Sequence, residues 1–551
     1  MENPVPLRER RRGRGLLRDR EKGSWVPPDI VPKDTTAFDA IADNIQFDFT
    51  LGGPLGHGDL LLLDSNQNHQ DDTHDHWAIE TYEGPMLDET ELFDAISASF
   101  SEAIMCPSPI TDMSLGTNAI FAGLPSVVEL TRSDHHALDH FQKNLVFGTK
   151  TPIWSTHSIL LQIGAQSPMT LHLILAASLA ELRWKDRNWP IVDHDADKHF
   201  QIGKQMFMDA LRSTEDKPDH VIMMASFWFM FLHQRRKVKR ERTTYQELST
   251  MMEAYVQKHR LDQTLPSSEA NILGYLDTDG SSLELMRLEV TSPARSSVLA
   301  RLAIWLFWAD AQSCFQGGGG SLAKALMSSS PDRMAMIHER SRSTFELYWG
   351  ALYPADEIRD DIQNASSLEL LHRTWVVVQE INEASDLRYT GQEMVLDIGR
   401  QIDSMRQRFS SVFRLTDTTG LRDRLVGNAD WAVTNFYALC IYFFRWSRRP
   451  STDLYAPARH EFADDPITRV VAALLTLIQK ALASGPAGQL DRLQWPLFWA
   501  GTETDDLIYR EWILNKLVDP ALHKALEMIF IEQPGGTRLG LDRIREICQD
   551  M

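Results

Sequence analysis

Apolar residues recur at helical spacing through most of the chain from about residue 131 onward. The stretch 244–256, for example, opens with a capping box and continues with an apolar residue at every third or fourth position. Pro331 and Pro520 each follow a Ser or an Asp, which is typical of a helix start. Strict alternation of apolar and polar residues almost never extends beyond four positions, so strands are not expected. The pattern predicts an all-α fold, built as an irregular array of many helices.

The N-terminal part of the chain lacks such periodicity and differs sharply in charge. Residues 1–22 carry eight basic and four acidic side chains, whereas residues 29–130 carry nineteen acidic side chains and a single basic one, Lys33. High net charge with few periodic apolar positions is typical of poorly ordered segments. We therefore predict a basic N-terminal tail (1–28), an acidic, largely disordered or loosely packed segment (29–130), and a helical domain (131–551).

Within the acidic segment, the stretch 87–100 mixes acidic residues with Leu92, Phe93, Ile96 and Phe100. Such a mixture suits a segment that folds on a partner, as activation domains do. The same four apolar residues also form a helical stripe, so an ordinary amphipathic helix that docks on its own domain is the other interpretation.

Composition narrows the class of protein. Hydrophobic residues make up 43% of the chain, which is enough for a sizeable core, and the net charge of −20 argues against a sequence-independent coat on nucleic acid. The four cysteines lie far apart, so neither a thiolate zinc site nor a disulfide scaffold is expected. The longest apolar run, 221–232, is too short to span a bilayer, and no signal peptide is recognised. We expect a soluble intracellular protein without a membrane partner.

Two histidine clusters have residue types that bind metals, but neither is expected to form a metal site. The His/Asp cluster at 69–76 lies in a polar, loop-like stretch, where nothing would fix ligands in place. His136 and His140 share a helix face and could hold a metal, but no Glu lies between them as in the HExxH zinc motif, and Asp134 is expected to cap that helix.

Asp360, Asp361 and Asn364 resemble the aspartate-rich motif of all-α isoprenoid synthases, in which carboxylates one turn apart hold Mg²⁺. Asn364 stands where that motif has its last carboxylate, and the second metal motif of those enzymes is not found downstream. A solvated helix face is therefore the expected role of these residues.

No phosphate-binding loop, nucleophile elbow or dinucleotide fingerprint occurs, and the glycine run 317–320 is expected to be a flexible turn between helices. The sequence thus offers no catalytic, metal-binding or cofactor-binding residues, and we predict that the chain is not an enzyme. An all-α, Mg-dependent enzyme of the isoprenoid type and a non-enzymatic helical interaction scaffold are the alternatives.

Two basic patches fit nuclear import or contact with phosphates. The first lies in the N-terminal tail. The second directly follows the apolar run 221–232, where basic side chains would also complement the negative end of a helix dipole. The candidate residues are Arg10, Arg11, Arg12, Arg14, Arg235, Arg236 and Lys237. Because no apolar stripe anchors the first patch, we expect it to contribute more to import than the second.

Three stretches of the helical part are similar to a known family. Residues 135–184 contain the alanine-rich string LAASLAEL, residues 299–326 place an aromatic and Asp-containing helix before a glycine-rich turn, and residues 493–517 contain WPLFWAG, an acidic stretch and an Arg. In this order they resemble segments of the fungal-specific transcription factor regulatory region. The late motif consists of Trp495, Pro496, Leu497, Phe498, Ala500, Gly501 and Arg510.

The late motif makes sense as structure and implies no chemistry. Its aromatic residues are expected to be buried, Pro496 to set a bend, Gly501 to permit a tight turn, and Arg510 to begin a final pair of helices.

The resemblance implies a transcription regulator that acts in the nucleus on RNA polymerase II genes. The acidic segment would then contact the transcription machinery or a coactivator. A homodimer and a small-molecule effector are further expectations.

One departure from the family concerns DNA binding. Its members usually carry an N-terminal zinc cluster of six cysteines that reads DNA, and this chain lacks those cysteines. Either a cluster is encoded upstream, which would bring zinc as a cofactor, or this is a regulator without one. Since positive charge is confined to two short patches, the chain itself is expected to bind DNA only weakly and in a salt-sensitive way.

Overall fold

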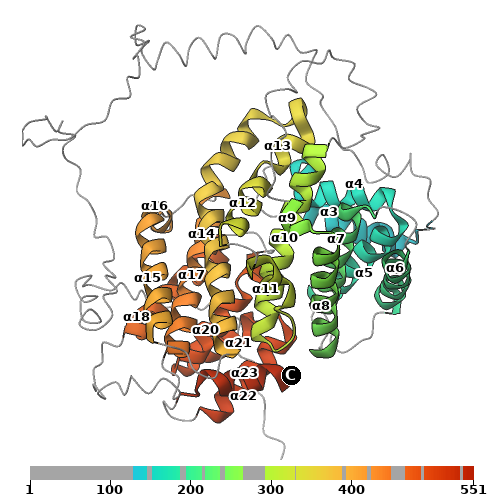
Figure 1. Cartoon of the computed structure of the whole chain (residues 1–551). Coiled ribbons are helices and arrows are strands. Elements are labelled where there is room, and N and C mark those ends of the chain that lie inside the picture. Colours follow the sequence, from blue (N-terminus) through green and yellow to red (C-terminus); the bar gives the residue numbers. More distant parts are fainter. Residues whose placement is uncertain are drawn as a thin grey trace, which may run out of the picture.

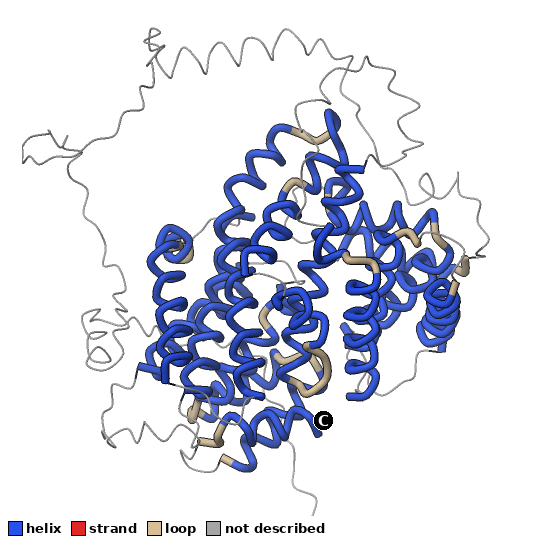
Figure 2. Tube along the Cα trace, viewed as in Figure 1, coloured by secondary structure: helices blue, strands red, loops and turns tan. Residues whose placement is uncertain are grey.

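Every element assigned in the described part of the computed structural model is a helix, as Figure 2 shows. The predicted all-α fold is confirmed. The structure describes residues 128, 130–144, 152–185, 194–213, 218–235, 242–264, 292–328, 331–386, 392–418, 424–447, 466–484, 489–533 and 538–550. The predictions for the basic tail and for residues 29–127 lie outside this description.

The first helices of the described chain run up to the turn after α10. They are α3 (Arg132–Asn144), η2 (Pro152–Trp154), α4 (Thr156–Gln166), α5 (Pro168–Lys185), α6 (His194–Arg212), α7 (His220–Arg235), α8 (Arg242–Lys258), α9 (Leu261–Thr264) and α10 (Ser292–Phe315).

The remaining helices form the larger part of the molecule. They are α11 (Ser321–Ser328), α12 (Pro331–Arg342), α13 (Thr344–Trp349), η4 (Gly350–Leu352), α14 (Ala355–Asp386), α15 (Gln392–Arg408), α16 (Ser410–Leu415), α17 (Arg424–Ser447), α18 (Pro466–Ser484), α19 (Gln489–Arg492), α20 (Gln494–Glu503), α21 (Leu507–Lys516), α22 (Pro520–Glu532) and α23 (Leu541–Asp550).

The long helix α10 lies at the centre of this array. It packs against α7 on one side and against α12, α13 and α14 on the other. Helices α3 to α8 gather on the α7 side, and α14 to α18 lie on the opposite side (Figure 1). One buried apolar cluster extends through both groups, from Ala137 in α3 to Cys548 in α23. The two groups therefore share a single core.

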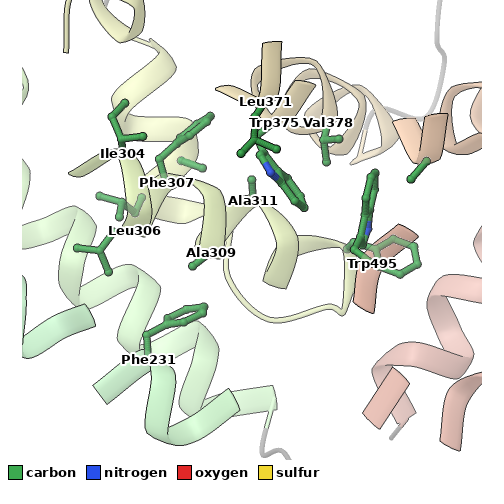
Figure 3. Packing of buried hydrophobic residues seen from close by; sticks show 14 of the residues in the cluster. Phe231, Ile304, Leu306, Phe307, Ala309, Ala311, Leu371, Trp375, Val378 and Trp495 are labelled. Carbon is green, nitrogen blue, oxygen red and sulfur yellow. The ribbon is translucent and has the colours of Figure 1, made fainter. Parts of the chain in front are cut away.

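Helix α10 fits this position because it is apolar nearly all round. Leu302, Leu306 and Phe307 are completely buried, and side chains from α7 and α14 pack on either side of it, as Figure 3 shows for Phe231 and Leu371. No helix among the described residues has the length and apolarity needed to cross a membrane.

Local sequence signals define several helix boundaries. Asp519 caps α22 by accepting hydrogen bonds from the backbone N–H groups of Ala521 and Leu522, and Pro520 occupies the first turn, as predicted. The chain from Pro331 to Trp349 is divided into α12 and α13 at Ser343. There, the backbone carbonyl of Ser341 accepts hydrogen bonds from Arg301 of α10.

The glycine run 317–320 forms the turn between α10 and α11. Gly319 has a φ angle of +109°, and a Cβ atom there would lie 2.9 Å from a carboxylate oxygen of Asp310. Asp310 is completely buried and accepts a hydrogen bond of 2.9 Å from the backbone N–H of Ala323 in α11. Only glycine combines that backbone conformation with so close an approach, so the turn requires it.

The late motif is buried as predicted, but two of its residues play other roles. Trp495 is 2% exposed, and Leu497 and Phe498 are completely buried. Pro496 lies in the first turn of α20, where proline is tolerated, so it sets no bend. Gly501 lies inside α20 and not in a turn: a Cβ atom there would approach Leu526 of α22 to 2.6 Å, so glycine allows close helix packing.

Arg510 does not begin a helix either. It lies within α21, which starts after the N-cap residue Asp506, and two further helices follow. Its Nε atom donates to the backbone oxygen of Thr504 at 2.8 Å, and its guanidinium lies 4.6 Å from the ring centroid of Phe530 in α22. Arg510 therefore joins the α20–α21 connection to α22.

Candidate ligand-binding cavity

A cavity of about 320 Å³ lies where the two groups of helices meet around α10. We call it the central cavity. Its wall is formed by side chains of α5, α7, α10, α12, α13, α14, α17, α19 and α20, together with the first residues of α4 and its N-cap. Ligand sites of proteins commonly have volumes of roughly 300–1,000 Å³ and lie between packed elements in this way.

Six tryptophans line the central cavity, and they pair across different helices. They are Trp228, Trp305, Trp308, Trp375, Trp431 and Trp495. The ring centroids are 5.2 Å apart in the pair from α7 and α10, 6.2 Å in the pair from α10 and α17, and 5.0 Å in the pair from α14 and α20. Figure 3 shows the last pair, Trp375 and Trp495. These rings give the cavity flat, apolar walls.

Helix periodicity explains how one helix supplies several wall residues. Arg301, Trp305, Trp308 and Gln312 of α10 follow one another at intervals of three or four residues, so they share one face of the helix. The positions of α17 that line the cavity, 424, 428, 431 and 435, have the same spacing. Sequence reasoning missed both stripes. The available signal was a regular line of polar residues and tryptophans within otherwise apolar helices.

Arg301 is held in place by uncharged groups. Its guanidinium donates to the backbone oxygen of Ser341 at 2.9 and 3.2 Å and to the hydroxyl of Thr156 at 3.1 Å. The ring of Phe345 covers it, with 4.2 Å between the guanidinium carbon and the ring centroid. Burial lowers the pKa of Arg301 to about 10, so the side chain stays charged at neutral pH.

Arg424 joins α17 to α14 through carboxylates. It donates to Asp361 at 2.6 Å and lies 3.5 Å from Glu357. The other oxygen of Asp361 accepts a hydrogen bond of 2.6 Å from the hydroxyl of Tyr353. The Nε atom of Arg424 is buried without a hydrogen-bond partner.

Arg492 comes from the short helix α19 and lies over the ring of Trp431 at 4.3 Å. It donates to the side-chain oxygen of Asn428 at 3.3 Å. Burial, followed by the nearby charge of Arg424, lowers the pKa of Arg492 to about 9. Five arginines and three carboxylates, Glu181, Asp361 and Asp491, line the cavity, so the wall has an excess of positive charge that favours an anion.

Two histidines in the wall are electrically neutral at physiological pH. Burial lowers the pKa of His157 and of His338 to about 4. His338 stacks on His372, with ring centroids 4.4 Å apart. The indole N–H of Trp308 donates to Nδ1 of His372 at 3.3 Å, which requires that nitrogen to carry no proton.

We expect His338 to make the protein less stable in mild acid. Its pKa is about 4 in the folded chain and 6.5 as the ordinary value, so between these two values the unfolded chain binds the extra proton. Stability is therefore lost as the pH falls, by about 2 kcal/mol from this group between pH 7 and pH 5. Urea unfolding of the H338F variant should show a correspondingly weaker loss over that range. Equal pH dependence in the two proteins would contradict this role.

The earlier metal candidates are engaged in other contacts. Asp361 is tied to Arg424, and Asn364 accepts a hydrogen bond of 2.7 Å from Asn428, so the expectation of a solvated helix face is wrong at these two positions. In the described ranges, no group of three or more His, Cys, Asp or Glu residues could hold a metal ion. The cluster at 69–76 lies outside those ranges.

The second histidine cluster, at the start of α3, does not place His136 and His140 in the same environment. His136 is exposed, whereas His140 is buried. Thr131, not Asp134, caps α3: its hydroxyl accepts from the backbone N–H of Asp134, and Asp134 accepts from the backbone N–H of Thr131. Asp134 also contacts Nε2 of His199 in α6 at 3.1 Å.

Of the basic candidates, only Arg235 lies in the described part of the chain. It lines the central cavity at the end of α7, and its Nε atom is 4.0 Å from a carboxylate oxygen of the buried Asp519. Residues Arg10, Arg11, Arg12, Arg14, Arg236 and Lys237 lie outside the described residues.

A second hollow of about 790 Å³ lies between α17, α18, the α20–α21 connection and residues 538–541. Its charged residues already pair with one another: Arg445 with Glu503, and Arg538 with Asp505. The central cavity is the stronger candidate site because its donors are less completely satisfied.

Comparison of the chain with protein-family models, curated proteins and solved structures found no match. The fold and the cavity by themselves define an all-α protein with an internal space lined by aromatic and cationic side chains.

Proposed function

We propose that this chain is a ligand-responsive transcription regulator of the fungal type, acting in the nucleus on RNA polymerase II genes. The helical region binds a small-molecule effector in the central cavity, and the acidic segment 29–130 contacts the transcription machinery or a coactivator. One observation supports the proposal above others. The three stretches that resemble the family lie far apart in the sequence, yet each supplies a wall residue of the cavity: His157, Arg301 and Trp495.

The position of the cavity suggests how an effector would act. Trp228 of α7 and Trp431 of α17 belong to the two groups of helices on either side of α10. A ligand that touches both side chains stabilises one relative arrangement of those groups. Because a ligand shifts the population toward the arrangement it binds better, binding would change the surface that the helical region presents to partners.

The proposal does not require the chain itself to bind DNA tightly. Zinc would enter only with a cysteine cluster encoded upstream, and a homodimer stays a prediction. The enzyme alternative gains no support from Asp361, because binding Mg²⁺ there would require its ion pair with Arg424 to break.

The proposal is tested by tethering the full chain to a promoter in fungal cells. Fused to an unrelated DNA-binding domain, the chain should change transcription of a reporter relative to that domain alone. Removal of residues 29–130 should abolish the change, since that segment supplies the contact with the transcription machinery. A fusion that is stably expressed and nuclear but leaves the reporter unchanged would contradict the proposal.

Nuclear entry is scored separately, with a fluorescent fusion that carries no other import signal. We expect alanines at Arg10, Arg11 and Arg12 to reduce the nuclear signal. The matched variant carries alanines at Arg235, Arg236 and Lys237 and should have the smaller effect, because Arg235 already faces Asp519. A cytoplasmic wild-type fusion under every condition would also count against the regulator.

A further inference from the structure

We infer that the ligand of the central cavity is a planar aromatic monocarboxylate, whose carboxylate pairs with Arg301 and whose ring lies among the tryptophans of α10. This inference deepens the proposed effector site and rests on it for its biological role. The binding chemistry follows from the charges, the donors and the shape of the cavity wall.

Charge favours an anion. Arg424 pairs with Asp361, Arg342 pairs with Glu339, and Arg235 faces Asp519. Arg301 differs, because its hydrogen bonds go only to neutral oxygen atoms of Thr156 and Ser341. No carboxylate of the described residues lies within ion-pair distance of it. Arg301 is therefore a buried cation of the wall whose charge an anionic ligand can neutralise.

The available donors fit a carboxylate. A guanidinium has five N–H groups, and three of those of Arg301 are engaged, so two are left for a ligand. The indole N–H groups of Trp228 and Trp495 are buried and have no hydrogen-bond partner, and Trp495 is only 2% exposed. A carboxylate offers about four acceptor positions. It can accept from Arg301 and from an indole at once, which gives these buried donors partners.

The wall next to Arg301 fits a flat ring. Trp305 and Trp308 follow Arg301 on the same face of α10, and Trp305 begins about 6 Å further along the helix axis, roughly one helical turn. Trp228 stands against Trp305, with 5.2 Å between ring centroids. Aromatic pairs prefer offset or edge-to-face geometry, so a planar ring can extend this arrangement. The volume of about 320 Å³ is suited to one or two fused rings.

The inference is tested with matched acids and alcohols on the purified full chain. The probes are benzoate with benzyl alcohol, and 2-naphthoate with 2-naphthylmethanol. Calorimetry and quenching of tryptophan fluorescence measure the dissociation constants at neutral pH. At least one acid should bind about 10- to 100-fold more tightly than its alcohol, because only the acid forms a charge-assisted hydrogen bond with Arg301.

Two variants of Arg301 and one control variant test whether this residue causes the preference for the acid over the alcohol. R301M should lose the preference for the acid while binding the alcohol as before, whereas R301K retains the positive charge and should retain part of the preference. R400M is the matched control, since Arg400 lies on α15 with a side chain 72% exposed and should leave both affinities unchanged. Circular dichroism and melting of each variant report whether it folds, because Arg301 also holds Ser341 and Thr156. The comparison of acid with alcohol on the wild-type chain does not depend on any variant.

Each outcome decides the inference. Tighter binding of an acid that disappears in R301M supports it. Equal affinity of both acids and their alcohols, absence of binding by all four probes at millimolar concentration, or an acid preference unchanged in a folded R301M protein overturns it. The reporter experiment is independent of these measurements. If the reporter responds but no acid binds, the regulator proposal is supported and the aromatic monocarboxylate is ruled out as the ligand. If an acid binds but the reporter does not respond, the ligand class is supported and the regulator proposal is contradicted.

Discussion

Truncation of Phe498 to alanine is expected to lower the free energy of unfolding by about 3–5 kcal/mol. The side chain is completely buried in α20, where its ring centroid lies 5.9 Å from that of Phe315 and 5.6 Å from that of Trp499. The substitution removes the buried ring and leaves a cavity that close packing of α20 against α17 and α22 cannot readily fill.

Denaturant unfolding followed by circular dichroism measures this loss. L507A is the matched control, because Leu507 is 76% exposed at the start of α21 and its truncation should change stability by less than about 0.5 kcal/mol. W495A is an informative third variant. Trp495 borders the central cavity but is only 2% exposed, so we expect a loss of the same order as for Phe498. If the F498A protein is as stable as the wild type, Phe498 does not pack closely in the core as described.

Replacement of Arg445 by methionine is expected to cost a similar amount, about 3–5 kcal/mol. Arg445 of α17 forms an ion pair with Glu503 at the end of α20, and the two side chains are only 10% and 5% exposed. Arg445 also donates to the backbone oxygen of Leu539 at 2.7 Å. The variant leaves the carboxylate of Glu503 buried, with Arg538 at 3.6 Å as its remaining cation. Most of the expected cost comes from that poorly compensated charge.

The double variant R445M/E503Q separates the buried charge from the lost packing. If the charge of Glu503 is the main cost, the glutamine should restore a large part of the stability that R445M loses. Thermal melting and denaturant unfolding of the wild-type, single and double variants measure this coupling. A loss below about 1 kcal/mol in R445M would contradict a structural role for the pair.

Recognition of the central cavity depends on residues that no local pattern connects. Of the candidates taken from the sequence, Arg235, Asp361 and Trp495 line it, and nothing in the sequence connected them with one another. Asp361 was expected on a solvated face because its neighbours in the sequence are polar. Its ion-pair partner, Arg424, comes from a helix that begins 63 positions later, and only packing of α14 against α17 brings the two together.

Local signals, by comparison, were good guides to the helices themselves. The cap at Asp519 and the helix start at Pro331 depend on a few adjacent residues, and both are found where the sequence places them. In the late motif, local signals did not predict the role of Gly501. Gly501 was assigned to a turn from its residue type, but the reason for glycine is the approach of Leu526, which is distant in the sequence.

The sequence by itself determined that this protein is all-α, where several of its helices begin, and that the aromatic residues of the late motif are buried. These features depend on hydrogen bonds and apolar spacing within one or two turns of helix, which neighbouring residues control. Only the tertiary structure decided that Arg301, Trp228 and Trp495 face one cavity, because each comes from a different helix. A cavity is the space left when those helices pack, and its charge and shape depend on distances between residues that the order of the chain does not set.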